Sequence, residues 1–178
     1  MRRVIDTNVP VVANGRSASA SIDCRLNAVE FLERMILEGR TVLDEGGDIQ
    51  GEYARHLFAR GQPGVGDRFF QMILQSQPDR VERIALPRSA ATGQYTHFPT
   101  DPTLAAFDQS DRVFAAAALA SGCPVVNAVD SDWAIHEARL VANGVTIEFL
   151  CGRALGRHRV PAVRRRRAAR PARRAAAD

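Results

Sequence analysis

The sequence predicts an α/β domain in three layers, α/β/α, with a mostly parallel central sheet. Short apolar runs bounded by turn residues alternate with segments in which apolar residues recur every three or four positions. The short runs are typical of buried strands, and the periodic segments are typical of amphipathic helices. Strands and helices that alternate in this way form a parallel sheet covered on both faces. The 178 residues are enough for one domain with a sizeable core.

Six elements are expected in the first half of the chain. Helix 22–39 has the clearest periodicity, with a start capped by Ser21 or Asp23 and an end near Gly39. Residues 9–13 continue the apolar run of the first strand. The expected elements are strands at 3–5, 41–43 and 81–86 and helices at 22–39, 49–57 and 65–75.

The second half begins with a loop at 87–102 and ends in a basic tail. The expected elements between them are helix 111–121, strand 124–129, helix 133–142 and strand 145–150. Residues 151–178, the basic tail, mix Arg with Ala and Pro without apolar periodicity, which is typical of disorder. We therefore expect one folded domain at 1–150, followed by a disordered tail.

The net charge of +4 averages these two unlike parts. Residues 1–150 carry 14 Arg against 19 Asp and Glu, whereas residues 151–178 carry 10 Arg against one Asp. The body is therefore acidic and the tail basic. The tail lacks the aromatic residues that read bases, so the composition fits phosphate binding and a solvated extension equally well.

Cysteine content and hydropathy indicate the compartment. Cys24, Cys123 and Cys151 are too few and too scattered for a disulfide framework or a zinc site, and free thiols suit a reducing cytosol. Asp6 and Asn8 interrupt the only candidate for the apolar region of a signal peptide. No apolar run approaches the roughly 18–20 residues that span a bilayer. The sequence predicts a soluble, cytoplasmic protein.

Five acidic residues stand at the ends of expected strands and helices. They are Asp6 after the first strand, Glu52 and Asp111 at helix starts, and Asp130 and Asp132 after strand 124–129. In an open α/β sheet, function gathers beyond the carboxyl ends of the strands. If the sheet is parallel, all five side chains can reach one edge, where like charges repel unless they are compensated.

Clustered carboxylates of this kind are typical of a divalent-cation site. Oxygen-only ligands suit Mg²⁺ or Mn²⁺ and do not suit zinc. Such ions generate a hydroxide nucleophile and stabilise the charge that develops on a phosphate. The sequence therefore predicts hydrolysis of phosphodiester bonds.

Helix capping is the competing explanation for these acids. Asp108 and Asp111 suit the first turn of a helix, and Asp130 and Asp132 could cap the helix that follows them. Asp6 has no such explanation, because it interrupts an apolar run at the end of a strand. The prediction of a site therefore depends on the convergence of the acids, and Asp108 is expected to be a cap alone.

Four segments of the chain form a series that matches a known pattern. They are VIDTN at 4–8, Glu52-Tyr53, DRVFAAAALASGCPVV at 111–126 and DSDW at 130–133. Together they resemble the motifs of the PIN-domain ribonucleases, with the VapC-type toxins of bacterial toxin–antitoxin pairs as the nearest relatives. The resemblance spans nearly all of residues 3–150 and implies a three-layer α/β/α fold with metal-dependent cleavage of RNA.

The resemblance also implies roles for individual residues. Asn8 would help to hold the first acid or a metal-bound water. The catalytic acids would be Asp6, Glu52, Asp111 and Asp130, and the ligands of Mg²⁺ or Mn²⁺ would be Asp6, Asp111, Asp130 and Asp132. An RNA substrate, a cognate antitoxin that inserts an Arg or Lys near the carboxylates, and a homodimer are implied as partners.

The chain departs from the family pattern at several points. The family often has Thr or Ser where Asn127 stands. Asn127 can still hydrogen-bond and is expected, with Asn8, to be a supporting residue of the site, so we expect retained but altered activity. Glu45 and Asp48 lie close enough in sequence to take the place of Glu52. The segment 61–102 is longer and richer in Pro and Gly than in compact relatives and matches no motif.

Two other function classes fit parts of the sequence. Asn127 and the basic tail suit an inactive PIN-like module that binds RNA or a protein. A DNA nuclease of the related flap-endonuclease type would need DNA-grasping segments that this short chain lacks. His56, on the helix that carries Glu52, is expected to face away from the site, and Trp133 is expected to be a core anchor.

Overall fold

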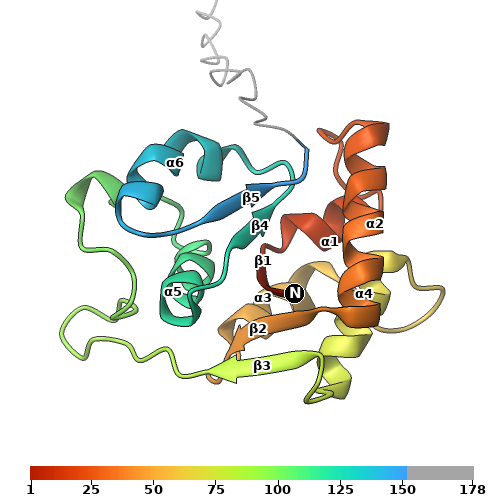
Figure 1. Ribbon diagram of the computed structural model, residues 1–178, viewed down its shortest axis with the longest axis horizontal. Helices are drawn as coiled ribbons and strands as arrows, with labels where there is room; N and C mark the ends of the chain where they lie inside the picture. Colours follow the sequence, from red (N-terminus) through yellow and green to blue (C-terminus); the bar gives the residue numbers. More distant parts are fainter. Residues whose placement is uncertain (152–178) are drawn as a thin grey trace, which may run out of the picture.

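A five-stranded, all-parallel sheet forms the centre of the protein (Figure 1). The computed structural model describes residues 1–151. The strands are β1 (Arg2–Ile5), β2 (Arg40–Asp44), β3 (Val81–Ile84), β4 (Val125–Asn127) and β5 (Ile147–Phe149), in the order β3-β2-β1-β4-β5. The predicted α/β class and the parallel sheet are confirmed.

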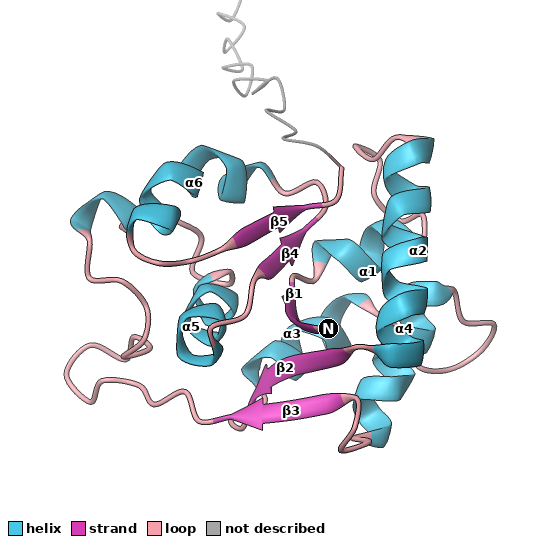
Figure 2. Ribbon diagram, in the orientation of Figure 1, coloured by secondary structure: helices cyan, strands magenta, loops and turns pink. Residues whose placement is uncertain are grey.

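Helices cover the sheet in two groups (Figure 2). They are α1 (Asn8–Ala13), α2 (Ile22–Glu38), α3 (Asp48–His56), α4 (Val65–Gln75), α5 (Arg112–Ser121) and α6 (Ser131–Ala142), with a short 3-10 helix, η1 (Pro102–Leu104). Helices α1, α2 and α4 pack against one another on one side, and α5 contacts β1, β2, β3 and β4 on the other. This arrangement has the three layers that the sequence predicts.

The expected helices agree closely with the observed ones, apart from one additional element. Helix α4 has the predicted bounds, and Ser21 caps α2, because its hydroxyl accepts a hydrogen bond from the Cys24 N–H at 3.1 Å. The apolar run at 9–13 is part of helix α1, an element that the sequence analysis did not assign. This helix lies close to α4: a Cβ added at Gly66 would lie 2.1 Å from the carbonyl oxygen of Pro10.

The expectation of free thiols is wrong for two of the three cysteines. Cys24, in the first turn of α2, and Cys151, just after β5, form a disulfide with their Cα atoms 4.8 Å apart. Only Cys123 is free, and it is buried. The bond joins Cys151, placed in the tail by the sequence analysis, to the folded domain. Apart from this residue, the predicted disordered tail lies outside the described residues.

The strand order defines where side chains can converge. Within the described part of the chain, β1 is the only strand that joins the pairs β2–β3 and β4–β5, so the connections run in opposite directions on its two sides. In open α/β sheets, the crevice at the carboxyl ends of the strands on either side of such a reversal is the usual place for a ligand. Asp6 directly follows β1, and Asp130 is the third residue after β4. No helix within residues 1–151 is long and apolar enough to span a membrane.

Candidate functional site

A cavity of about 240 Å³ opens at the reversal between β1 and β4. Its lining contains the four predicted catalytic acids, which come from four separate parts of the chain: Asp6 after β1, Glu52 on α3, Asp111 before α5 and Asp130 before α6. Asn8 and His56 also line it. The expected convergence of these four acids is therefore present, although they are up to 124 positions apart in sequence.

Asp6 is held in place by two hydrogen bonds and is only 3% exposed. Its Oδ1 accepts from the backbone N–H of Asn8 at 2.8 Å, and its Oδ2 accepts from the indole N–H of Trp133 at 2.5 Å. Tyr53 holds the preceding residue, because its hydroxyl donates to the Ile5 carbonyl at 2.5 Å. The carboxylate at the end of β1 therefore has a fixed orientation.

Two asparagines fix the loop that carries Asp130. The side chain of Asn8 donates to Asn127 Oδ1 at 2.7 Å and accepts from the Ala128 N–H at 2.7 Å. Asn127 in turn donates to the Asp130 carbonyl at 2.9 Å and accepts from the Asp130 N–H at 3.2 Å. Both residues named as supporting by the sequence analysis thus connect the start of α1 to the loop after β4.

The capping explanation applies to Asp130 and does not apply to Asp111. Asp130 Oδ1 accepts from the Asp132 N–H at 2.9 Å and caps α6, which leaves Oδ2 without a hydrogen-bond partner among residues 1–151. The Asp111 side chain makes no capping bond and accepts no hydrogen bond from a described residue. Asp108 accepts from the N–H and hydroxyl of Ser110, both at 2.7 Å, and so stabilises the turn before α5.

Burial and mutual repulsion favour protonation of these acids. Burial, followed by repulsion from Asp6 and Asp130, raises the pKa of Asp111 to about 9. Burial also raises the pKa of Asp6 to about 7, although the hydrogen bonds from Asn8 and Trp133 oppose this shift. The pKa of Asp130 is raised for the same reasons, with repulsion from Asp132 and Asp108 adding to burial. Within residues 1–151, no ion pair compensates Asp6, Asp111 or Asp130.

Glu52 differs from the three aspartates because basic side chains already contact its carboxylate. The carboxylate forms an ion pair with Arg55, and its Oε1 lies 3.3 Å from His56 Nε2. His56 lines the cavity, contrary to the expectation that it faces away from the site. The spacing in the sequence indicates this placement, because His56 lies one helical turn after Glu52 and so shares its face of the helix.

The remaining candidate acids lie outside this cavity. Asp48 pairs with Arg88 at 2.8 Å and accepts from the Tyr95 hydroxyl at 2.7 Å. Glu45 is exposed in the turn after β2. Asp132 accepts from the Asp108 N–H at 2.8 Å and lies 3.5 Å from His136, so its role as a metal ligand stays a prediction.

Sequence reasoning missed how the core supports the site. Trp133 is a fully buried core residue, as predicted, but its N–H also orients Asp6, which lies 127 positions away. Asp44, at the end of β2, is 1% exposed and accepts from the N–H groups of Asp48 and Ile49. Its two oxygens are therefore committed to the start of α3, which carries Glu52.

The donor set has the chemistry that suits a hard divalent cation. The carboxylate oxygens of Asp6, Asp111 and Asp130 are the ligand type that Mg²⁺ and Mn²⁺ prefer, and their uncompensated repulsion is what a cation would relieve. Among residues 1–151, no three His, Cys, Asp or Glu side chains stand in a ready-made ligand arrangement. The chemistry of the donors, and not their spacing, therefore supports a cation.

Comparison with known proteins adds no family assignment to this geometry. No protein-family model, curated protein or solved structure matches the chain.

Proposed function

We propose that the protein is a Mg²⁺- or Mn²⁺-dependent endoribonuclease. The observation that carries the proposal is the convergence of Asp6, Asp111 and Asp130, uncompensated by any described cation, at the reversal between β1 and β4. A cluster of carboxylates that repel one another costs stability, and a bound divalent cation offsets that cost. The sequence resemblance to PIN-domain ribonucleases supports RNA as the substrate.

Each residue has a separate task in this proposal. Asp6, Asp111 and Asp130 would hold the cation, whose chemistry is the activation of water and the neutralisation of charge on the reacting phosphate. Trp133 and the Asn8 backbone keep the Asp6 carboxylate oriented, and Asn127 keeps Asp130 in place. Glu52, with His56 at 3.3 Å, places a carboxylate and an imidazole on the α3 side of the cavity. Either group would be available there to accept or donate a proton during cleavage.

Cleavage of RNA by the purified full chain tests the proposal. We expect single-stranded RNA to be cut in Mn²⁺ or Mg²⁺ and to stay intact in EDTA. An inactive RNA- or protein-binding module is the second candidate, favoured by Asn127 in place of Thr or Ser. Isothermal titration with Mn²⁺ separates the two: metal binding without cleavage, or no metal binding at all, contradicts the nuclease proposal.

A role as the toxin of a toxin–antitoxin pair is the more specific form of this proposal. Its support is the sequence resemblance, together with an acidic cavity into which an Arg or Lys of an antitoxin could insert. Such a toxin would act on cytoplasmic RNA. Co-expression with the product of the gene immediately upstream is expected to abolish cleavage, and unchanged cleavage would contradict this form of the proposal.

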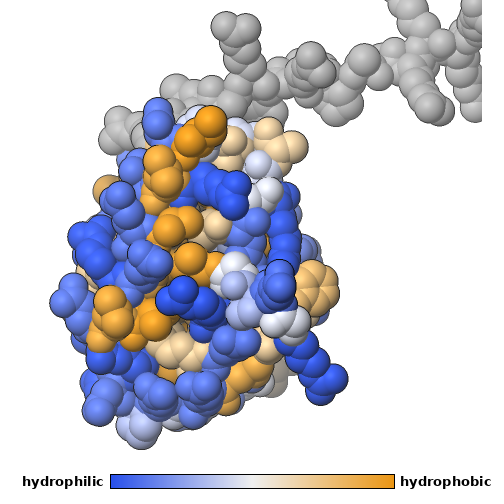
Figure 3. Space-filling view, turned by 90° about the vertical axis from the view of Figure 1, so that its right-hand side faces the viewer, coloured by the Kyte–Doolittle hydropathy of each residue, from blue (hydrophilic) through white to orange (hydrophobic). Residues whose placement is uncertain are grey.

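The proposal also includes a homodimer, supported by an apolar stripe on the side of α2 and α4 (Figure 3). On α2, Ile22 is 79% exposed, Leu26 53% and Leu37 71%. Large apolar side chains gathered on one surface are typical of a protein contact. Light scattering is expected to give the mass of two chains, and the double variant Leu26→Ser, Leu37→Ser is expected to give the mass of one. A single-chain mass for the unchanged protein would contradict the dimer.

A further inference from the structure

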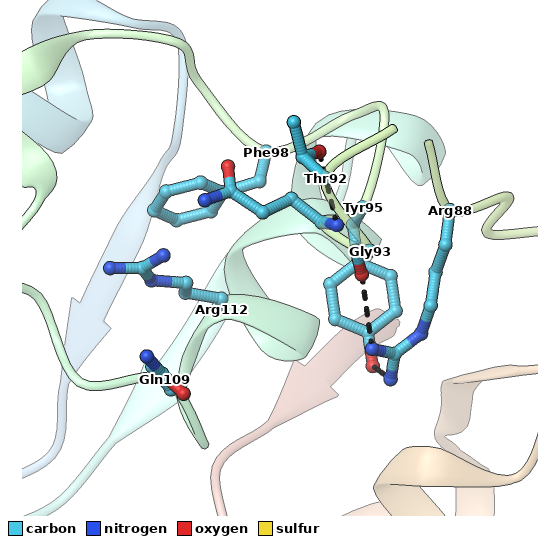
Figure 4. Close-up of a pocket in the computed structure, with 8 residues that line it drawn as sticks. Arg88, Thr92, Gly93, Tyr95, Phe98, Gln109 and Arg112 are labelled. Atoms are coloured by element: carbon cyan, nitrogen blue, oxygen red, sulfur yellow. Dashed lines mark hydrogen bonds between the residues drawn. The ribbon is translucent and has the colours of Figure 1, made fainter. Parts of the chain in front are cut away.

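A second pocket, of about 210 Å³, lies between the 87–102 loop and the start of α5 (Figure 4). It is lined by two arginines, Arg88 and Arg112, and by the rings of Tyr95 and Phe98. In Figure 4 the guanidinium of Arg112 lies beside the Phe98 ring, and that of Arg88 lies against Tyr95. The pocket therefore presents cations held by aromatic rings.

This pocket is linked to the carboxylate cavity by residues that line a hollow adjoining both. A third hollow, of about 180 Å³, lies between them. It shares Glu52 and Ser110 with the carboxylate cavity and shares Arg88, Tyr95 and Gln109 with the arginine pocket. The three adjoining hollows, called the groove below, follow one another from the acids of the candidate site past the turn before α5 to Arg112.

The two arginines differ in how far their charges are compensated. Arg88 forms an ion pair with Asp48 at 2.8 Å. Arg112 donates from Nε and Nη2 to the carbonyls of Phe107 and Ala105, at 2.9 to 3.3 Å, and forms no ion pair with a described carboxylate. Neutral carbonyls fix its guanidinium without cancelling its charge. Its Nη1 has no hydrogen-bond partner among residues 1–151.

The aromatic rings in the pocket are not free to stack on a base. Phe98 is 6% exposed, with the Phe107 ring stacked against it and the guanidinium of Arg112 5.1 Å from its centroid. Tyr95 is 9% exposed and carries the guanidinium of Arg88 at 4.2 Å. The groups that remain for a ligand are cationic and polar donors, which suit a phosphate and not a nucleobase.

We propose that the groove is the path of the RNA strand and that Arg112 binds a backbone phosphate on one side of the cleaved bond. This inference rests on the proposed function for its choice of RNA as ligand. Arg112 is thus a positioning residue: by holding a neighbouring phosphate, it keeps the scissile phosphate at the acidic cavity. The negative charges of the acids repel the phosphates of the strand, and a cation further along the groove offsets that repulsion.

The test is the salt dependence of RNA binding to the full chain in EDTA, where no cleavage interferes. Fluorescence anisotropy with a single-stranded RNA of about a dozen nucleotides is expected to show affinity about tenfold lower for Arg112→Gln at low salt. For Arg112→Gln, the slope of log affinity against log salt concentration should be smaller in magnitude by about 0.7, the value for one phosphate contact on a single strand. The basic tail is the same in every variant, so any contribution from it cancels in the comparison.

Two further variants separate charge from structure. Arg34→Gln removes an exposed arginine of α2 that also has no ion pair within the described residues, and it is expected to leave the slope unchanged. Arg112→Lys keeps the charge but loses the paired bonds to carbonyls, so it should restore the slope even if thermal unfolding shows that both Arg112 variants are less stable. An unchanged slope in Arg112→Gln, an equal change in Arg34→Gln, or no RNA binding by the unchanged protein would overturn the inference.

The same measurements distinguish the strand from a phosphate terminus and separate this inference from the proposed function. Oligonucleotides with and without a 5′-phosphate are expected to show the same Arg112-dependent slope, and dependence on the 5′-phosphate would overturn the proposed strand path. If the unchanged protein binds RNA through Arg112 but cleaves none in Mn²⁺, the proposed function fails and the path stands. If the unchanged protein cleaves RNA but Arg112→Gln has the same salt slope as the unchanged protein, only the proposed strand path fails.

Discussion

Asp111→Asn is expected to abolish RNA cleavage and, without divalent cations, to stabilise the protein. Loss of a residue that only supports a metal ligand costs about 10–100-fold in activity, so loss of a ligand itself should cost about 100-fold or more. The stability gain follows from burial beside Asp6 and Asp130, which makes the charged form of Asp111 unfavourable. Because the carboxylate accepts no hydrogen bond from a described residue, the amide breaks none.

The gain in stability should depend on pH. The folded-state pKa of Asp111, about 9, lies above the value of 3.8 for a free side chain. Between these values the folded protein keeps a proton that the unfolded chain has lost, so the free energy of unfolding falls as the pH rises. Asp111→Asn removes this contribution, and we expect it to be more stable than the unchanged protein by at least about 1 kcal/mol at pH 8. Near pH 4 the difference should disappear.

Urea unfolding at several pH values, together with RNA cleavage in Mn²⁺, measures both effects. Asp79→Asn, at an exposed aspartate in the turn before β3, is the matched control and should change neither quantity. Added Mn²⁺ should raise the unfolding temperature of the unchanged protein and of Asp79→Asn, but should have little effect on Asp111→Asn. An Asp111→Asn variant that is as active as the unchanged protein would refute its role as a ligand.

Trp133→Phe is expected to lower both stability and activity. The substitution removes the indole N–H that donates to Asp6 Oδ2 and leaves a buried carboxylate oxygen without its donor. An unsatisfied buried acceptor of this kind costs about 1–3 kcal/mol, and the smaller ring adds a packing loss. Since Trp133 also orients a proposed metal ligand, activity should fall about 10–100-fold.

The effect of Trp133→Phe should be largest at alkaline pH. The lost hydrogen bond favours the charged form of Asp6, whose pKa is about 7, so the stability penalty should grow as Asp6 ionises above that pH. Phe107→Leu is the control. The Phe107 ring packs edge-on against Trp133, with 5.1 Å between the ring centroids, and it forms no hydrogen bond to Asp6. It should lose stability but keep its activity. Full activity in Trp133→Phe would show that the N–H does not position the acid.

Local patterns predicted much of the fold and the composition of the carboxylate cavity. Helix α4 was predictable because its apolar residues keep helical spacing through eleven positions, whereas the six residues of α1 are too few for such a pattern. Asp6 was predictable because an acid at the end of an apolar run has no local explanation. The convergence of the acids followed from the parallel sheet alone, since all its strands end at one edge.

Features that depend on contacts between distant segments could not be predicted in the same way. The bond from Trp133 to Asp6 and the Cys24–Cys151 disulfide each join residues 127 positions apart, and no spacing in the sequence indicates either. The arginine pocket was equally hidden, because it forms only when the irregular 87–102 loop folds back against Arg112. Irregular loops have no periodicity from which their contacts can be inferred.

The central position of β1 makes the proposed site a product of cooperative folding. Within residues 1–151, this strand alone hydrogen-bonds to both halves of the sheet, yet it comes first in the chain and lies outside the covalent ring closed by Cys24 and Cys151. A partly folded form that lacks β1 would contain two unconnected strand pairs, with Asp6 separated from Asp111 and Asp130. The carboxylates therefore meet only in the completed sheet, so an incompletely folded chain would lack the proposed cation site.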